Sequence, residues 1–489
     1  MNALNKYLTF LIAAEMLISP LIAEEKRILK SNMTLIYKSS NKASTLSEIF
    51  TKGIYYGRFR VNSFIWDWKK KYFDKTKDNW ALGVGGSLIF KSAYLHGIGF
   101  TIGFYTSQNP WHMDKDEVIY VKSGKDTFSR YKVKNGGGFG ITSLAQSYLE
   151  YKNKKTAFKI GRQIFESLLT KSNDTKMIPN TFEGVSLISR YVSHTTFKIA
   201  YLTKQKLRDH IKFHDVITFK DKNGDGWANN DDAAVHKGLT YQKLEKNGKK
   251  TDNSLIIFEI LNNSIDNLKI MINYTGIPYL FHILTGEAHY KMCFKNDMGI
   301  IPGLRYLVQF DDGAGKIGGA NLKADSLGYK DPNSLDSFLL AARVDIKKGP
   351  WMIRVGYSKV ADKGDIVTPW RGFPTGGFTR AMGQYNWYAG TKTYMLKGVY
   401  DFGKAGISDG LKVSLRYALE DFDDKKPGVQ ADSRVLNFDV FKKFKSFPGL
   451  YAKIRMGIVK GDGNTKDMRG NLKRDPSYQE YRFELNYLF

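Results

Sequence analysis

The last stretch of the chain, Ser477 to Phe489, alternates between two kinds of side chain. One set is mostly apolar or aromatic and the other mostly charged or polar: Gln479, Tyr481, Phe483, Leu485, Tyr487 and Phe489 against Glu480, Arg482, Glu484 and Asn486. A period of two residues predicts a β-strand with one apolar face. An edge strand of a soluble sandwich is one interpretation, whereas an aromatic carboxyl terminus with rings in line is typical of outer-membrane β-barrels.

The rest of the sequence lacks a long apolar segment, so the chain could cross a membrane only with strands. A spanning helix needs about 20 apolar residues, and none of that length follows the N-terminal region. Nothing in the composition divides the 489 residues into domains, and a single cysteine, Cys293, excludes an internal disulfide framework. An exported chain without disulfides fits a barrel closed by backbone hydrogen bonds.

Alternation of the same kind recurs along the chain. We expect strands beginning near Gly53, Trp80 and Ile98, and further strands near 138–151, 155–165, 183–193, 195–206, 253–263, 266–277, 279–295, 298–311, 335–347, 350–361, 392–402, 409–421, 433–444, 449–461 and 477–489. Short connections alternate with long ones, such as 207–250 and 361–391, as expected of periplasmic turns and extracellular loops. The sequence therefore predicts an all-β, transmembrane antiparallel β-barrel of about eighteen strands over residues 53–489.

The N-terminal region predicts export. Residues 1–23 hold a lysine followed by an apolar run, which is typical of a secretory signal peptide cleaved after Ala23. Glu15 within the run and Leu21 near the cut make the pattern imperfect, and an uncleaved anchor is the alternative. We expect cleavage. Residues 24–52 are expected to form a short N-terminal lead-in to the barrel.

The net charge of +27 raises the question of a nucleic-acid partner. The 75 lysines and arginines are spread along the chain, without a basic tail, a zinc-finger spacing or an aromatic RNA-binding motif. We therefore expect no nucleic-acid binding. We expect the charge to coat a water-filled lumen and the loops.

The middle of the chain resembles the OprD family of outer-membrane porins. The resemblance lies in the succession Gly161-Arg162-Gln163, Ser172-Asn173-Asp174 and Pro179 to Val185, and continues in Arg305 to Gly313, Tyr400-Asp401-Phe402 and Leu415-Arg416-Tyr417. It implies a monomeric barrel of eighteen strands in the bacterial outer membrane. It also implies that Phe165 to Phe182 fold into the lumen as a constriction loop.

The constriction loop supplies the first group of candidate residues. They are Glu166, Lys171, Asn173, Asp174, Lys176, Pro179, Thr181 and Phe182. Solute contact is one role for them. The alternative is structural, because Asn and Asp cap turns while Pro and Gly fix loop shape.

Basic residues on the polar faces of the strands supply the second group. They are Arg58, Arg60, Arg305, Arg343, Arg354, Lys412, Arg416, Lys453, Arg455 and Arg482. A charge facing lipid at the midplane costs roughly 2–4 kcal/mol, so these side chains should face the lumen. The resemblance implies passage of small anionic, carboxylate-bearing or amino-acid-like solutes along such residues. Alternatively, Asp345, Glu420, Glu480 or Glu484 neutralise them and they hold the wall rigid.

The connection 207–250 contains a candidate calcium loop. The spacing D-x-N-x-D-G is typical of oxygen ligands for calcium, and the candidates are Asp221, Asn223, Asp225, Trp227 and Asp232. Asp232 stands where a bidentate Glu is usual. A plain turn rich in Asp and Asn remains the alternative, and no cofactor is required for the predicted function.

A passive channel is the function that these observations predict. No G-x-S-x-G or H-E-x-x-H motif is present, so an enzyme on a barrel is the third alternative, after a closed or non-selective structural or adhesive barrel. The expected partners are outer-membrane lipids, small solutes and the barrel assembly machinery, which would recognise Phe489. A monomer and a weak trimer both remain open.

Overall fold

The computed structural model describes residues 28–29, 35–36, 41–69, 78–121, 127–172, 177–220, 236–319, 321–323 and 325–489. The predicted signal peptide, 1–23, lies outside these residues, and so does the candidate calcium loop, 221–232.

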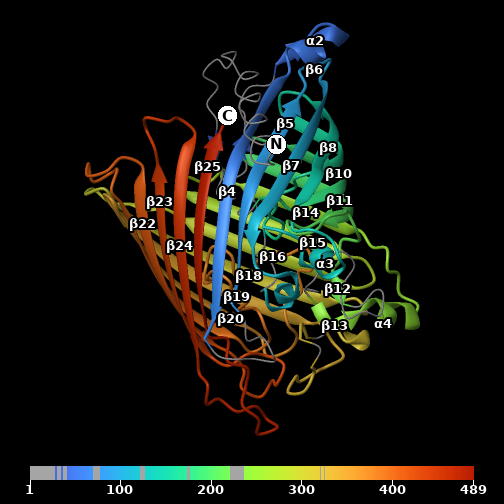
Figure 1. Cartoon of the computed structure of the whole chain (residues 1–489), viewed down its shortest axis with the longest axis vertical. Helices are drawn as coiled ribbons and strands as arrows, with labels where there is room; N and C mark the ends of the chain where they lie inside the picture. The colour runs from blue at the N-terminus through green and yellow to red at the C-terminus, as the bar shows by residue number, and fades with distance from the viewer. Residues whose placement is uncertain are drawn as a thin grey trace.

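Eighteen long strands in the described part of the chain form one closed antiparallel barrel (Figure 1). They are β4 (Ile54–Trp68), β5 (Asn79–Lys91), β7 (Ile98–His112), β8 (Ile141–Lys152), β9 (Thr156–Gln163), β10 (Thr181–Ser189), β11 (Thr195–Lys206), β14 (Leu255–Asn262), β15 (Leu268–Ile277), β16 (Phe281–Tyr290), β18 (Met298–Asp311), β19 (Ser337–Lys348), β20 (Trp351–Val360), β21 (Lys392–Asp401), β22 (Leu411–Asp421), β23 (Ser433–Lys443), β24 (Leu450–Gly461) and β25 (Tyr478–Leu488). β25 pairs with β4 and closes the barrel. The predicted fold, strand number and strand positions are confirmed.

Short elements lie in the connections and before the barrel. The strands are β1 (Ile28–Leu29), β2 (Leu35–Ile36), β3 (Lys42–Ala43), β6 (Tyr94–Leu95), β12 (Phe219–Lys220), β13 (His236–Thr240) and β17 (Met292–Cys293). The helices are α2 (Leu46–Thr51), η1 (Lys115–Tyr120), α3 (Arg130–Lys134), α4 (Tyr241–Lys246) and η2 (Gly315–Ile317). None of the helices in the described part of the chain is long and apolar enough to cross a membrane. The expected lead-in, 24–52, thus includes a helix that its Ser-rich composition did not predict.

The two faces of the strands differ as the alternation predicts. In β25, Tyr481, Phe483 and Tyr487 are 40–43% exposed on the outside, whereas Glu480 and Glu484 are buried on the inside. Exposed rings of this kind would be unfavourable against water and fit the hydrocarbon of a bilayer. The interpretation of the carboxyl-terminal strand as a membrane strand is therefore confirmed.

The two ends of the barrel differ in the length of their connections. The long-loop end carries the connections 113–140, 164–180, 207–254, 312–336 and 361–391, and the short-turn end carries 153–155, 190–194 and 349–350. Figure 1 shows α2 and the carboxyl terminus together at the short-turn end. One connection departs from the pattern, because 278–280 joins β15 to β16 tightly at the long-loop end.

Candidate functional site

Three cations from neighbouring strands lie side by side on the lumen wall. Arg354 of β20 is directly opposite Lys397 of β21, and Lys397 is directly opposite Arg416 of β22. The residues next to them in sequence, Val355 and Leu396, are 55% and 54% exposed on the outer surface. Because side chains alternate along a strand, the three cations face the lumen. We call them the basic row.

Carboxylates on the wall offset part of the positive charge. Asp345 accepts hydrogen bonds from Nε and Nη2 of Arg354 at 2.5 and 2.7 Å. Asp439 accepts one from Nε of Arg455 at 2.8 Å. Two further predicted arginines are paired on the wall, Arg305 with Glu287 and Arg482 with Glu480. Each of these four arginines thus has a carboxylate partner on the wall.

Other cations are not neutralised in this way. Within the described residues, Lys397 and Lys453 have no carboxylate at ion-pair distance, although Glu484 lies opposite Lys453 in the register. Arg416 donates from Nη1 to the carbonyl oxygen of Arg380 at 2.8 Å, which leaves its charge uncompensated by that contact. These side chains add positive potential to this wall without a directly paired carboxylate.

The remaining predicted wall cations lie elsewhere. Arg58 and Arg60 are buried on β4, and Nε of Arg60 donates to Oδ1 of Asn486 at 2.6 Å. Lys412, near the short-turn end, is half exposed and forms an ion pair with Asp401 at 2.8 Å. Arg343 donates from Nη1 to the carbonyl oxygen of Gly377. The ten predicted cations thus do not form one group.

The connection 164–180 is held inside the barrel by wall residues. The backbone N–H of Leu168 donates to Oε2 of Glu259 on β14 at 2.5 Å, and Nζ of Lys198 on β11 donates to the carbonyl oxygen of Glu166 at 2.9 Å. Leu168 and Leu169 are buried in the largest apolar cluster. This inward position is the one expected of a constriction loop.

The predicted residues of this loop differ in what they contact. The carboxylate of Glu166 accepts a hydrogen bond from Oγ of Ser172 at 2.9 Å, so it stabilises the loop itself. Burial lowers the pKa of Lys171, and the nearby carboxylate of Glu166 opposes the shift. Pro179 is buried just before the wall, and Thr181 and Phe182 are the first residues of β10 rather than loop residues. Asn173, Asp174 and Lys176 lie outside the described residues.

The glycine of the recognised motif has a structural role. Gly184 has a φ of 151°, and a Cβ at this position would lie 2.3 Å from the carbonyl oxygen of Tyr201. The register between β10 and β11 shifts between Glu183 and Gly184. A side chain would clash with the neighbouring strand at this bulge, so only glycine fits.

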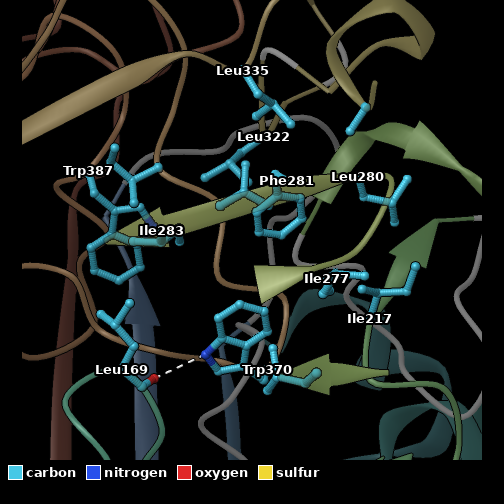
Figure 2. Close-up of a cluster of buried hydrophobic side chains, with 14 of the residues drawn as sticks. Leu169, Ile217, Ile277, Leu280, Phe281, Ile283, Leu322, Leu335, Trp370 and Trp387 are labelled. Carbon is cyan, nitrogen blue, oxygen red and sulfur yellow. Dashed lines mark hydrogen bonds between the residues drawn. The ribbon is translucent and has the colours of Figure 1, made fainter. Parts of the chain in front are cut away.

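A second connection, 361–391, also folds into the lumen, and the sequence analysis did not predict it. The carbonyl oxygen of Gly377 accepts a hydrogen bond from Nη1 of Arg354 at 2.8 Å, and that of Pro374 accepts one from Nη1 of Arg305 at 2.6 Å. Figure 2 shows Trp370 of this connection beside Leu169 of the first loop, with Nε1 donating to the Leu169 carbonyl oxygen at 3.0 Å. The two inward loops therefore meet.

The second loop adds a cation to the basic row. Burial, together with the charges of Arg208, Arg416 and Arg455, lowers the pKa of Arg380 to about 9. Its guanidinium lies 3.4 Å from the centre of the Phe373 ring, a cation–π contact. Arg380 stays charged at neutral pH, so positive charge from the loops and the wall converges in one part of the lumen.

Two features of the sequence indicate Lys397 and the second inward loop, neither of which was predicted. Lys397 follows the exposed Leu396 with the same alternation as the predicted cations, so the strand pattern already places it inside. The connection 361–391 is unusually rich in large apolar side chains for a water-exposed loop: Trp370, Phe373, Phe378, Trp387 and Tyr388. Such a composition indicates burial.

Metal binding receives no support from the described residues. Among them, no group of three or more His, Cys, Asp or Glu side chains is placed to hold a metal ion. The calcium candidates Asp221, Asn223, Asp225, Trp227 and Asp232 lie outside the described part, so calcium binding stays a prediction.

Comparison with known proteins agrees with this architecture. Residues 140–250 match the model of the family described as outer membrane porin, OprD family. No curated protein sequence matches the chain significantly.

Solved structures share the fold at low sequence identity. Pseudomonas aeruginosa OccK9 (OpdG) is 16% identical, with a TM-score of 0.67 over 90% of this chain and 99% of that chain. Acinetobacter baumannii OccAB3 is 17% identical, with a TM-score of 0.66 over 90% and 99%. Pseudomonas aeruginosa OpdK with vanillate is 13% identical, with a TM-score of 0.64 over 89% and 98%.

The matched segment contains the motif loop, and the whole barrel has the strand number and inward loop expected from the resemblance. A chain of this kind resides in the bacterial outer membrane and passes small solutes by diffusion. The chain is thus similar to the OprD family of outer-membrane porins, by the family model over residues 140–250 and by the barrel fold that it shares with the solved structures.

Proposed function

We propose that the channel favours small anionic solutes, with carboxylates as the main class. The observation that carries the proposal is the basic row, in which Arg354, Lys397 and Arg416 stand directly opposite one another on the lumen wall. Rows of charged side chains that line a pore bias which ions enter. Lys397 and Arg416 carry most of the proposal, because among the described residues neither has a carboxylate at ion-pair distance.

The mechanism is electrostatic and passive. The two inward loops narrow the path beside the basic row, and water is replaced there by protein of lower dielectric constant. An anionic group passing the row loses part of its hydration but gains attraction to the row and to Arg380. Vanillate, present in the structure of OpdK, is an aromatic carboxylate, and this chemistry is the kind the basic row would attract.

A closed barrel is the second candidate, and one observation favours it. The two inward loops pack through a cluster of buried apolar side chains that includes Leu169, Phe281 and Trp370 (Figure 2). If this cluster blocked the path, the barrel would conduct no ions. Conductance therefore separates the two candidates.

The decisive measurement is the reversal potential of single channels across a salt gradient in a planar bilayer. Wild-type protein should prefer anions, and the variant Lys397→Gln/Arg416→Gln should lose much of this preference. The matched control, Lys154→Gln/Lys155→Gln, removes two charges from an exposed turn and should behave as wild type. A cation preference in wild type would overturn the proposal, and an absence of conductance would favour the closed barrel.

We also propose a role for the end of the barrel in assembly. Phe489 exchanges backbone hydrogen bonds with Gly57 at 3.1 and 3.2 Å, and its ring centre lies 5.1 Å from that of Phe59. These contacts place the terminal ring beside the seam between β25 and β4, which supports recognition by the assembly machinery before closure. Deleting Phe489 should slow folding in cells, measured as accumulation of unfolded protein.

A further inference from the structure

Four cations face the outside of the barrel at the long-loop end, away from the lumen. Lys359 of β20 is directly opposite Lys392 of β21, and Arg434 of β23 is directly opposite Lys460 of β24. We call these four residues the rim cations. Each of them lies within two residues of a strand end.

The direction of these side chains follows from their neighbours. Ser358 and Val360 are 1% and 0% exposed and face inward, so Lys359 between them faces outward. Val435 and Val459 are equally buried, and the adjacent Arg434 and Lys460 are exposed. The rim cations therefore lie on the surface that continues the lipid-facing wall.

Their arrangement is unfavourable for the protein alone. Side chains directly opposite in an antiparallel pair have Cβ atoms about 4.5–5.5 Å apart, and like charges there are destabilising. Only Lys392 has an acidic partner, Asp421 at 3.2 Å. In the described part of the chain, Lys359, Arg434 and Lys460 have no ion-pair partner.

On another part of its outer surface, the barrel places a carboxylate opposite an outward cation. Arg162 of β9 is opposite Glu183 of β10, and Nε of Arg162 lies 3.3 Å from Oε2 of Glu183. An outward cation can thus be given an acidic neighbour on the adjacent strand. At the rim the neighbour directly opposite is a second cation, so an anion from outside the chain would relieve the repulsion.

The aromatic side chains next to the rim cations indicate at which level of the membrane these cations lie. Tyr357 and Tyr394 are two residues deeper in the same strands, with ring centres 5.2 Å apart, and Tyr394 is 50% exposed. Tyrosines on the outer wall mark the boundary between hydrocarbon and headgroups. Lys359 and Lys392, directly above these rings, are thus at the level of the headgroups, and Arg434 and Lys460 lie at the same end of their strands.

We propose that the rim cations bind the phosphate groups of a lipid headgroup in the outer leaflet of the outer membrane. Arg434 offers a planar fork that matches phosphate geometry, and the lysines add point charges around it. The acyl chains of the same lipid would lie against the apolar wall below Tyr357 and Tyr394. This site is separate from the lumen, so it does not depend on the proposed solute preference.

The test uses the full-length protein in detergent, titrated with bis-phosphorylated lipid A and followed by native mass spectrometry. Wild type should bind it saturably. The variant Arg434→Gln/Lys460→Gln should bind at least roughly tenfold more weakly, because each cation near an anionic headgroup adds to the attraction. The control Lys154→Gln/Lys155→Gln loses the same charge at the opposite end and should bind as wild type.

Two further measurements test the proposal, one with a charge-preserving variant and one with a lipid A that lacks phosphates. The swapped variant Arg434→Lys/Lys460→Arg keeps both charges and should retain binding, even if the neutral variant folds poorly. Lipid A without phosphates should bind weakly to wild type. Equal binding of the two forms, unchanged binding by a folded Arg434→Gln/Lys460→Gln variant, or equally tight binding of inorganic phosphate alone would each overturn the proposal.

Discussion

Trp370 donates a hydrogen bond from Nε1 to the carbonyl oxygen of Leu169 at 3.0 Å, although the two residues are 201 positions apart in the sequence. The contact joins the two inward loops, 164–180 and 361–391. Both side chains are buried, at 1% and 0% exposure. The contact lies inside the barrel, where the two inward loops meet. The contact therefore belongs to neither loop alone, and it links the two segments that fold into the lumen.

Replacing Trp370 should widen the channel without opening the barrel. Trp370→Ala removes both the hydrogen bond and a large buried side chain, a change that costs about 3–5 kcal/mol in a packed core. Because the strand ladder is untouched, we expect the loss to loosen the loops. Single-channel recordings should show a larger and noisier conductance than wild type.

A tryptophan on the lipid-facing wall provides the control. Trp351 is 56% exposed at the short-turn end of β20. Trp351→Ala should leave the conductance unchanged. Equal conductance in all three proteins would show that the loop contact does not limit the passage of ions.

Removing Arg354 and removing Lys397 from the basic row should change the conductance in different ways. Arg354 is paired with Asp345 and also donates to the carbonyl oxygen of Gly377. In the described part of the chain, Lys397 has neither an ion pair nor a hydrogen bond of this kind. Lys397→Gln should lower anion preference about twofold, because a charge about 8 Å from a passing ion in water contributes about 0.5 kcal/mol.

Arg354→Gln should lower the preference and also disturb the second inward loop. We therefore expect noisy conductance in Arg354→Gln and quiet conductance in Lys397→Gln. Reversal potential and current noise, recorded from the same channels, measure both effects. Quiet conductance in both variants would contradict the role assigned to the Gly377 contact.

The ion pair between Arg371 and Asp209 connects the second inward loop to the connection 207–254. Both side chains are buried, and Nη2 of Arg371 lies 3.0 Å from Oδ2 of Asp209. Asp209→Asn would leave a buried charge without its counter-charge, a loss of about 3–5 kcal/mol. Urea unfolding should show a clear loss of stability, while Asp297→Asn on an exposed turn should be neutral.

Asp365 should make stability depend on pH. Its carboxyl group is buried in the second inward loop and accepts hydrogen bonds from the backbone N–H groups of Ala389 and Leu322, both at 2.7 Å. Burial raises its pKa from 3.8 to about 6, although these hydrogen bonds oppose the shift. The folded protein therefore holds this proton more tightly than the unfolded chain.

The contribution of Asp365 to the free energy of unfolding should then be greatest below about pH 4 and be lost as pH rises through about 6, by at most about 3 kcal/mol. Asp365→Asn cannot ionise and should lack this part of the decrease. Urea unfolding of both proteins between pH 4 and 7 gives the difference. A constant difference across this range would contradict a raised pKa.

Much of the fold could be predicted from local patterns. The alternation in β25, with Tyr481 outside and Glu480 inside, follows from the period of two and needs no knowledge of the partner strand. The same pattern located the other long strands and the inward direction of cations such as Arg354 and Arg416. The resemblance around Gly184 predicted the first inward loop.

Only the tertiary structure decided which residues meet. The position of Lys397 between Arg354 and Arg416 depends on the register of three strands, and a shift of register would change the row without changing any local pattern. The pairing of Arg455 with Asp439 has the same origin. The second inward loop depends on contacts such as Trp370 with Leu169. Alternation is a property of neighbouring residues, whereas register and loop packing are set by contacts between distant segments, so the sequence alone determined the wall and the tertiary structure determined the channel.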